Sequence, residues 1–139
     1  MNKLSRLDIQ KLEDYWINFN QYKTQLKFRE WELLNQYVET DTNQGGGKGN
    51  GISNPTERKA LVLAEDMLYQ NLKRIVGAID NIYSSLEGDK KTIVDMRYWD
   101  AAGCYEWEDI AEELDISRNK VLRKRNLLID KTAERLGWL

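Results

Sequence analysis

Apolar residues recur at helical spacing through most of the chain, and this pattern predicts an all-α fold. The N-terminal segment, residues 1–44, contains no Pro and no Gly, and we expect a helix over residues 4–38. Its apolar positions repeat every three or four residues, which places them on one helix face. They are Leu12, Trp16, Phe19, Leu26, Leu33 and Tyr37.

The same segment is rich in aromatic residues, and two interpretations of them stay open. One is a core face combined with a protein-contact face. The other is stacking on unpaired bases or docking on a polymerase, because aromatic rings with basic neighbours suit exposed bases. The aromatic and basic residues concerned are Tyr15, Trp16, Phe19, Tyr22, Lys23, Lys27, Phe28, Arg29 and Trp31.

A Gly-rich linker is predicted at residues 45–54, because five of the seven positions from Gly45 to Gly51 are glycine. Such a composition favours a flexible connection. A phosphate-binding loop is the competing interpretation. It is disfavoured because the segment lacks the Gly-Lys-Ser/Thr ending and no strand is predicted before it.

A long central helix is expected over residues 55–88. Asn54 suits the N-cap, Pro55 the first helical position and Glu57 the third. Apolar residues then keep helical spacing for about 30 residues, which at 1.5 Å per residue span about 45 Å. They are Leu61, Ala64, Leu68, Leu72, Ile75, Ile79, Ile82 and Leu86.

A helix of this length needs a packing partner. Either the N-terminal helix folds back over it, which we favour, or two copies of the chain form a short coiled coil; a spacing that alternates three and four allows both. Gly77 lies within the apolar stripe. It either permits the close approach of another helix or weakens this one.

Residues 89–139 are predicted to form a helix-turn-helix domain. Glu87 and Gly88 close the central helix, and Asp89 is expected to cap the next one. The apolar residues of that next helix would pack over the two helices that follow. We expect core positions at Ile93, Met96, Tyr98 or Trp99, and Trp107.

The core of this motif is the stretch 105–131. Its first helix has an apolar face and ends near Asp115, because Asp is a poor residue for a helix interior. Ser117 suits the N-cap of the second helix, which starts at Arg118 and ends at Gly137, with Trp138 folding back on the module. The expected inward residues are Trp107, Ile110, Ala111 and Leu114, then Val121, Leu128 and Thr132, with the stem of Arg125 between Val121 and Leu128.

Charge separates the two helices. Residues 106–115 carry six carboxylates and no base, whereas residues 117–131 carry six Lys or Arg against one Asp. Only the second helix therefore suits a polyanion. A helix of this kind presents its N-terminal turns to the major groove of DNA, where Arg and Asn can read base edges and Ser, Lys and backbone amides hold phosphates.

The predicted DNA-binding site lies on the outward face of this second helix and on its flanks. Arg118, Asn119, Lys120 and Arg123 are assigned to the groove, with Asn126 within reach of it; Ser117, Lys124 and Arg125 are assigned to phosphates. The alternative interpretation is a solvated helical hairpin whose halves carry opposite charge.

Composition limits the other classes of function. The chain has 139 residues, 32% of them charged, a net charge of −2, a single cysteine and no histidine. We therefore expect no zinc or other metal site, no cofactor and no enzyme activity, and a structural or incidental Cys104. No apolar run is long enough for a membrane span and no signal peptide is apparent, so we expect a cytoplasmic protein without membrane partners.

The same residues carry a resemblance to a known family. Tyr98-Trp99, the run YEWEDIAEELDISRNKV from Tyr105 to Val121 and the terminal AERLGW are similar to the C-terminal part of the RinA/ArpU-like phage late transcriptional activators. The helix-turn-helix of that family is similar to region 4 of sigma factors. The resemblance implies a phage protein in a bacterial host cell that activates late packaging and structural genes together with host RNA polymerase.

Two other functions remain as alternatives. One is a small terminase-like component of phage DNA packaging, although in such proteins the DNA-binding motif more often precedes the assembly helices. The other is a sigma-like initiation subunit that binds core polymerase in place of the host factor. We expect a monomer or a homodimer, because nothing in the sequence distinguishes the two.

Overall fold

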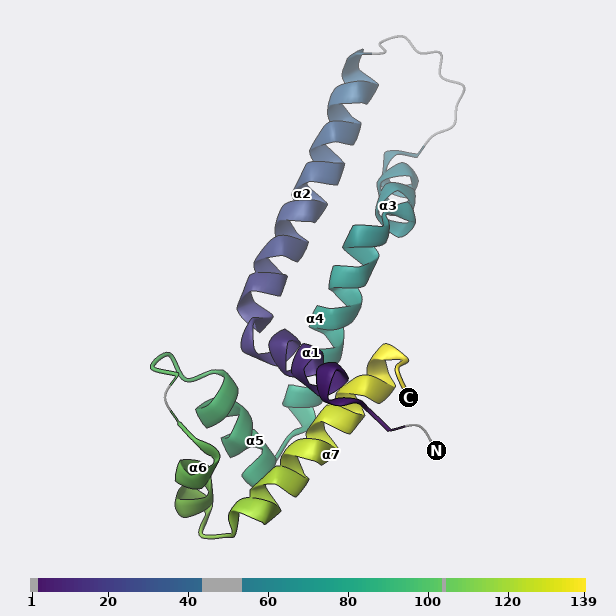
Figure 1. Ribbon diagram of the computed structural model, residues 1–139. Coiled ribbons are helices and arrows are strands. Elements are labelled where there is room, and N and C mark those ends of the chain that lie inside the picture. Colours follow the sequence, from purple (N-terminus) through teal and green to yellow (C-terminus); the bar gives the residue numbers. More distant parts are fainter. Residues whose placement is uncertain (1–2, 44–53, 104) are drawn as a thin grey trace. The chain divides into compact units, whose positions relative to one another are not determined.

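The computed structural model describes residues 3–43, 54–103 and 105–139, the backbone alone for 36–43, and within these ranges every regular element is helical. The predicted all-α fold is confirmed (Figure 1). The Gly-rich linker prediction, apart from Asn54, and Cys104 lie outside the described residues. The elements are α1 (Arg6–Ile17), α2 (Phe19–Asn43), α3 (Pro55–Glu65), α4 (Met67–Ser85), α5 (Asp89–Ile93), a π-helical turn η1 (Val94–Tyr98), α6 (Trp107–Leu114) and α7 (Arg118–Leu136).

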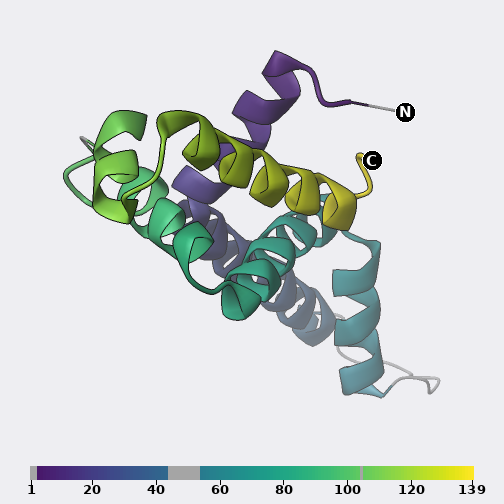
Figure 2. The same ribbon diagram turned by 90° about the horizontal axis from the view of Figure 1, so that it is seen from below.

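The chain divides into two compact units. Unit 1 combines the N-terminal residues through Phe19 with Ile75–Leu139, and unit 2 comprises Asn20–Arg74. This division differs from the domains expected at 1–44, 55–88 and 89–139, because α1 and the second half of α4 belong with the C-terminal helices. The reason is that α1 packs on α7 and η1 and buries Leu12 and Trp16. Figure 2 shows α1 crossing α7.

Trp16 is at the centre of unit 1. Its side chain is fully buried, and its indole Nε1 donates a hydrogen bond to Thr132 Oγ1 on α7 at 3.0 Å. The Trp16 carbonyl in turn accepts a hydrogen bond of 2.7 Å from Trp99 Nε1. The rings of Tyr98 and Trp99 lie 6.4 and 6.0 Å from the Trp16 ring. This aromatic cluster joins α1 to the C-terminal part of the chain.

The helix expected over residues 4–38 is instead two helices, divided at Asn18. The Asn18 side chain donates a hydrogen bond to Asp14 Oδ1 at 2.6 Å, and its backbone adopts φ −101° and ψ 24°. Asn ends helices readily because its side chain competes for local hydrogen bonds. Ser5 caps α1 at its other end, and its side chain accepts a hydrogen bond from the Asp8 amide.

The long helix expected over residues 55–88 is likewise divided, at Asp66. This residue has φ −83° and ψ 116°, outside the helical region, and its Oδ2 accepts a 2.8 Å hydrogen bond from the Tyr69 amide, as an N-cap does. Arg29 of α2 binds the same carboxylate through two nitrogens, at 3.0 and 2.7 Å. Within unit 2, α2 therefore folds back against the α3–α4 junction, which is the intramolecular packing that we favour from the sequence.

Burial along α3 and α4 is uneven. The N-cap bond of Asn54 forms as expected, with its side chain accepting from the Thr56 amide at 2.9 Å. Leu61 and Leu68 of the predicted apolar stripe are more than half exposed, at 57% and 53%. The later positions of the stripe are buried, namely Leu72, Ile75, Ile79 and Ile82.

The start of α5 also departs from expectation. Gly88, not Asp89, occupies the N-cap position, with φ +61°, which a glycine adopts without strain. Asp89 becomes the first residue of α5, and its carboxylate pairs with Lys124 of α7 at 3.5 Å. None of the helices among the described residues has the combined length and apolarity that a bilayer span requires.

Gly77 yields a first prediction, because the space where its side chain would be is empty. A Cβ added there meets no atom within 4 Å, so no other helix approaches closely at this position. Gly77→Ala should raise the free energy of unfolding by roughly 0.5–1 kcal/mol, measured by urea denaturation.

The matched control is Gly137→Ala. Gly137 is equally open but has φ +82°, where an L side chain is strained, so this variant should lose stability. A Gly77→Ala protein that is no more stable than wild type would contradict the conclusion that Gly77 lies in an open helical position.

Asp66 yields a second prediction, on pH. The Arg29 guanidinium, and then the Tyr69 amide, lower the pKa of the Asp66 carboxyl below its usual value. The Asp66 carboxyl therefore binds its proton more tightly in the unfolded chain than in the folded protein. The stability contributed by the ionised carboxylate should be complete above pH ~3.9 and should be lost as pH falls through the lowered pKa of the folded state.

Urea unfolding at a series of pH values tests this. Asp66→Asn keeps an oxygen for the cap but lacks the charge, so it should be less stable than wild type at neutral pH and should lose less stability in acid. Asp80→Asn, at an exposed position of α4, is the control, and its stability should follow that of wild type at each pH. Parallel pH profiles for wild type and Asp66→Asn would exclude the role of this ion pair.

Candidate functional site

The turn between α6 and α7 has the geometry expected from its residues. Asp115 ends α6 in the left-handed conformation, with φ 57° and ψ 45°, and the Ile116 amide donates to the Ala111 carbonyl at 3.1 Å. Ser117 caps α7, and its Oγ accepts a 3.2 Å hydrogen bond from the Lys120 amide. At the other end α7 stops at Gly137, and Trp138 contacts the Tyr15 ring edge-on.

A small apolar core holds α5, α6 and α7 together. Trp107 is half-buried at its edge, and the guanidinium groups of Arg97 and Arg125 lie 4.5 and 5.2 Å from its ring centroid. Trp99, also expected in this core, belongs instead to the Trp16 cluster and is half-buried there. The members of this small core are Ile93, Ile110, Ala111 and Val121, with Met96, Trp107, Leu114 and Ile116 packed against them.

The outward face of α7 is formed by residues of its N-terminal half. Val121 is fully buried, whereas Asn119, Arg123 and Asn126 on the opposite side of the helix are exposed. Within the described chain, no hydrogen bond or ion pair engages the side chains of Asn119 and Arg123. The inward stripe is longer than expected, because Ile129, Ala133 and Leu136 are buried together with Leu128 and Thr132.

Six of the eight residues assigned from the sequence are exposed, namely Ser117, Arg118, Asn119, Lys120, Arg123 and Asn126. Arg118 pairs with Glu108 of α6 at 3.0 Å, but both side chains are about half exposed or more, so this surface pair contributes little. Lys124 is half-buried and pairs with Asp89 of α5.

Arg125 departs from its assignment to a phosphate. Its Nη1 lies 3.0 Å from Glu13 Oε2 on α1, and both side chains are less than one-fifth exposed, at 17% and 18%. The Tyr98 hydroxyl donates to the same Glu13 oxygen at 2.6 Å. Burial, and then the Glu13 carboxylate, raise the pKa of Tyr98, which stays protonated and donates this bond. Arg125 therefore belongs to the packing of α1 on α7.

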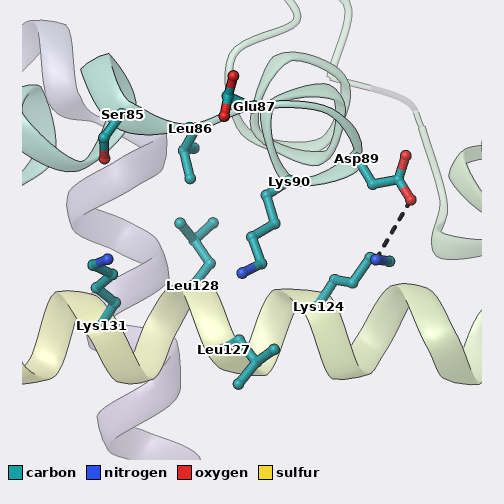
Figure 3. A pocket seen from close by; sticks show the side chains of 9 residues that line it. All are labelled: Ser85, Leu86, Glu87, Asp89, Lys90, Lys124, Leu127, Leu128 and Lys131. Carbon is teal, nitrogen blue, oxygen red and sulfur yellow. Dashed lines mark ion pairs between the residues drawn. The ribbon is translucent and has the colours of Figure 1, made fainter.

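A basic hollow, which sequence reasoning missed, lies beside α7. Figure 3 shows it between α7 and the segment from Ser85 to Lys90. Its volume is about 310 Å³. Lys131 shares the flank of α7 that carries Lys124, and the spacing of seven residues between them could have revealed this from the sequence. Lys90 of α5 was not identifiable, because only the tertiary structure brings it to α7. The remaining lining residues are Leu86, Glu87, Asp89, Leu127 and Leu128.

The aromatic residues of the N-terminal segment separate into two sets. Trp16 and Phe19 are buried in unit 1. Phe28 and Trp31 of α2 are 58% and 59% exposed and stack on each other, with their ring centroids 5.9 Å apart. No group of His, Cys, Asp and Glu side chains among the described residues is arranged to hold a metal ion.

Comparisons with known proteins place the chain in a family but add no named relative. Neither the curated proteins nor the solved structures contain a match. The model of a family described as "Protein of unknown function (DUF722)" matches residues 3–134, which is nearly the whole chain, and the protein therefore belongs to this family.

Proposed function

We propose that this protein is a sequence-specific DNA-binding activator of phage late genes, those for packaging and structural proteins, and that it acts with host RNA polymerase. The observation that carries the proposal is the outward face of α7. Asn119 and Arg123 project from the first turns of a capped helix, opposite the fully buried Val121. In this proposal α6 and α7 are the two helices of a helix-turn-helix.

The chemistry of these side chains suits base edges. Arg bonds bidentately to guanine and Asn to adenine in the major groove, which is about 12 Å wide and admits one α-helix. Arg123 and Asn119 have this role, with Arg118 and Lys120 beside them and Asn126 at the margin. The free amides at the start of α7, with Ser117, suit a phosphate, because a helix N-terminus attracts anions.

The activator role rests on the resemblance of residues 98–138 to phage late activators. The exposed Phe28 and Trp31 of unit 2 offer an apolar surface of the kind found in protein contacts, and we assign them to polymerase or to a second copy of the chain.

Selection of a preferred site from a random duplex library tests DNA reading. Arg123→Ala should weaken binding to the selected site by about 1–3 kcal/mol and relax the base preference, because the variant cannot form a bidentate bond to a base. Lys124→Ala should lower affinity evenly across sequences and reduce the salt dependence, because the lysine binds only a phosphate.

Arg135→Ala is the matched control, since this exposed arginine lies in the last turn of the same helix. It should keep the wild-type base preference. Failure of the wild-type protein to select any sequence, or equal binding by Arg123→Ala, would refute DNA reading by α7. Transcription in vitro from a template bearing the selected site, with host polymerase, tests activation; no added transcript would refute it.

A further inference from the structure

We infer that the basic hollow between α5 and α7 holds the phosphate backbone of one DNA strand, with Lys90 and Lys131 as backbone contacts in addition to Lys124. This inference rests on the proposed function and extends its binding site. It concerns a surface formed by two helices, whereas the base-reading face lies on α7 alone.

The lysines of the hollow lie along its length. Figure 3 shows Lys131 and Lys124 rising from α7 on either side of Leu128, and Lys90 reaching toward them from α5. Lys120, Lys124 and Lys131 share one flank of α7, over about 16 Å at 1.5 Å per residue. A flank of this length can reach more than one phosphate of the same DNA strand, since each nucleotide of the strand carries one. A row of separated ammonium groups suits an extended polyanion better than one small anion.

The charges of the hollow are available to a ligand. Among the described residues, Lys90 and Lys131 form no ion pair. Lys124 and Asp89 are paired at 3.5 Å, but their side chains are 35% and 40% exposed, and such pairs are weak and readily exchanged. With Glu87, the lining holds two carboxylates against three ammonium groups, so a positive charge remains.

The opposite flank of α7 repels DNA. There α6 presents Glu108, Asp109, Glu112 and Glu113, all exposed. A duplex that meets the outward face of α7 is therefore repelled on the α6 side and attracted on the α5 side. Because of this difference in charge, we place the contact with the DNA backbone at the lysine hollow and not at the start of α6.

Salt dependence tests the inference, because the slope of log K against log salt concentration decreases by about 0.9 for each phosphate that the protein no longer neutralises. Lys90→Gln and Lys131→Gln should each produce this reduction on the selected duplex, lower the affinity at low salt and leave base preference unchanged. Lys91→Gln is the matched control. Lys91 neighbours Lys90, lies over the Tyr83 ring at 5.5 Å and does not line the hollow, so its variant should keep the wild-type slope.

The outcomes separate the inference from the proposed function. A wild-type protein that selects no DNA sequence overturns both. Specific binding with unchanged slopes in Lys90→Gln and Lys131→Gln overturns the inference alone. An equal reduction in Lys91→Gln also overturns it, because the effect would then follow net charge and not the hollow. Urea denaturation of each variant verifies that the fold is retained.

Discussion

The burial of Trp16 against α7 is the interaction on which unit 1 depends. The indole is fully buried, and its N–H is satisfied by Thr132 Oγ1, whose own hydroxyl donates to the Leu128 carbonyl at 2.9 Å. An unpaired indole N–H in such a core would cost roughly 1–3 kcal/mol. Because the partners are 116 residues apart in sequence, this one side chain connects the start of the chain to its last helix. The compact unit that contains α7 therefore includes the N-terminal residues.

Because of this packing, one basic residue of α7 takes part in the fold, whereas the others stay at the surface. Arg125 is held by Glu13 and by the Trp107 ring, where a planar guanidinium can form both contacts at once. The lysines stay at the flank, where a long stem keeps the ammonium group in water. The outward face is left to Asn119 and Arg123. An exposed face of this kind, with a flank of lysines on one side and a row of carboxylates on the other, supports the proposal of a helix that meets DNA from one side.

Local signals in the sequence are sufficient to predict a helix end where a single residue type has a strong preference for that position. Ser117, Asn54 and Gly137 lie at helix ends as expected, because hydroxyl or amide caps and a left-handed glycine act within three or four residues. At Asn18 and Asp66, by contrast, the pattern predicts a continuous helix. A polar residue at such a position is equally compatible with the exposed face of an uninterrupted helix. The division at Asp66 becomes visible only with Arg29, which binds it from 37 residues away.

By itself, the sequence determined the all-α class, the capped α7 and the opposite charges of α6 and α7, because helical periodicity, capping and charge are properties of short stretches. Only the tertiary structure decided that Arg125 is occupied by Glu13, that Lys90 joins Lys124 and Lys131 around one hollow, and that α1 belongs with the C-terminal helices. These features depend on pairs of residues far apart in the chain. Such pairs are selected by the burial of apolar faces, and no local pattern specifies which faces meet.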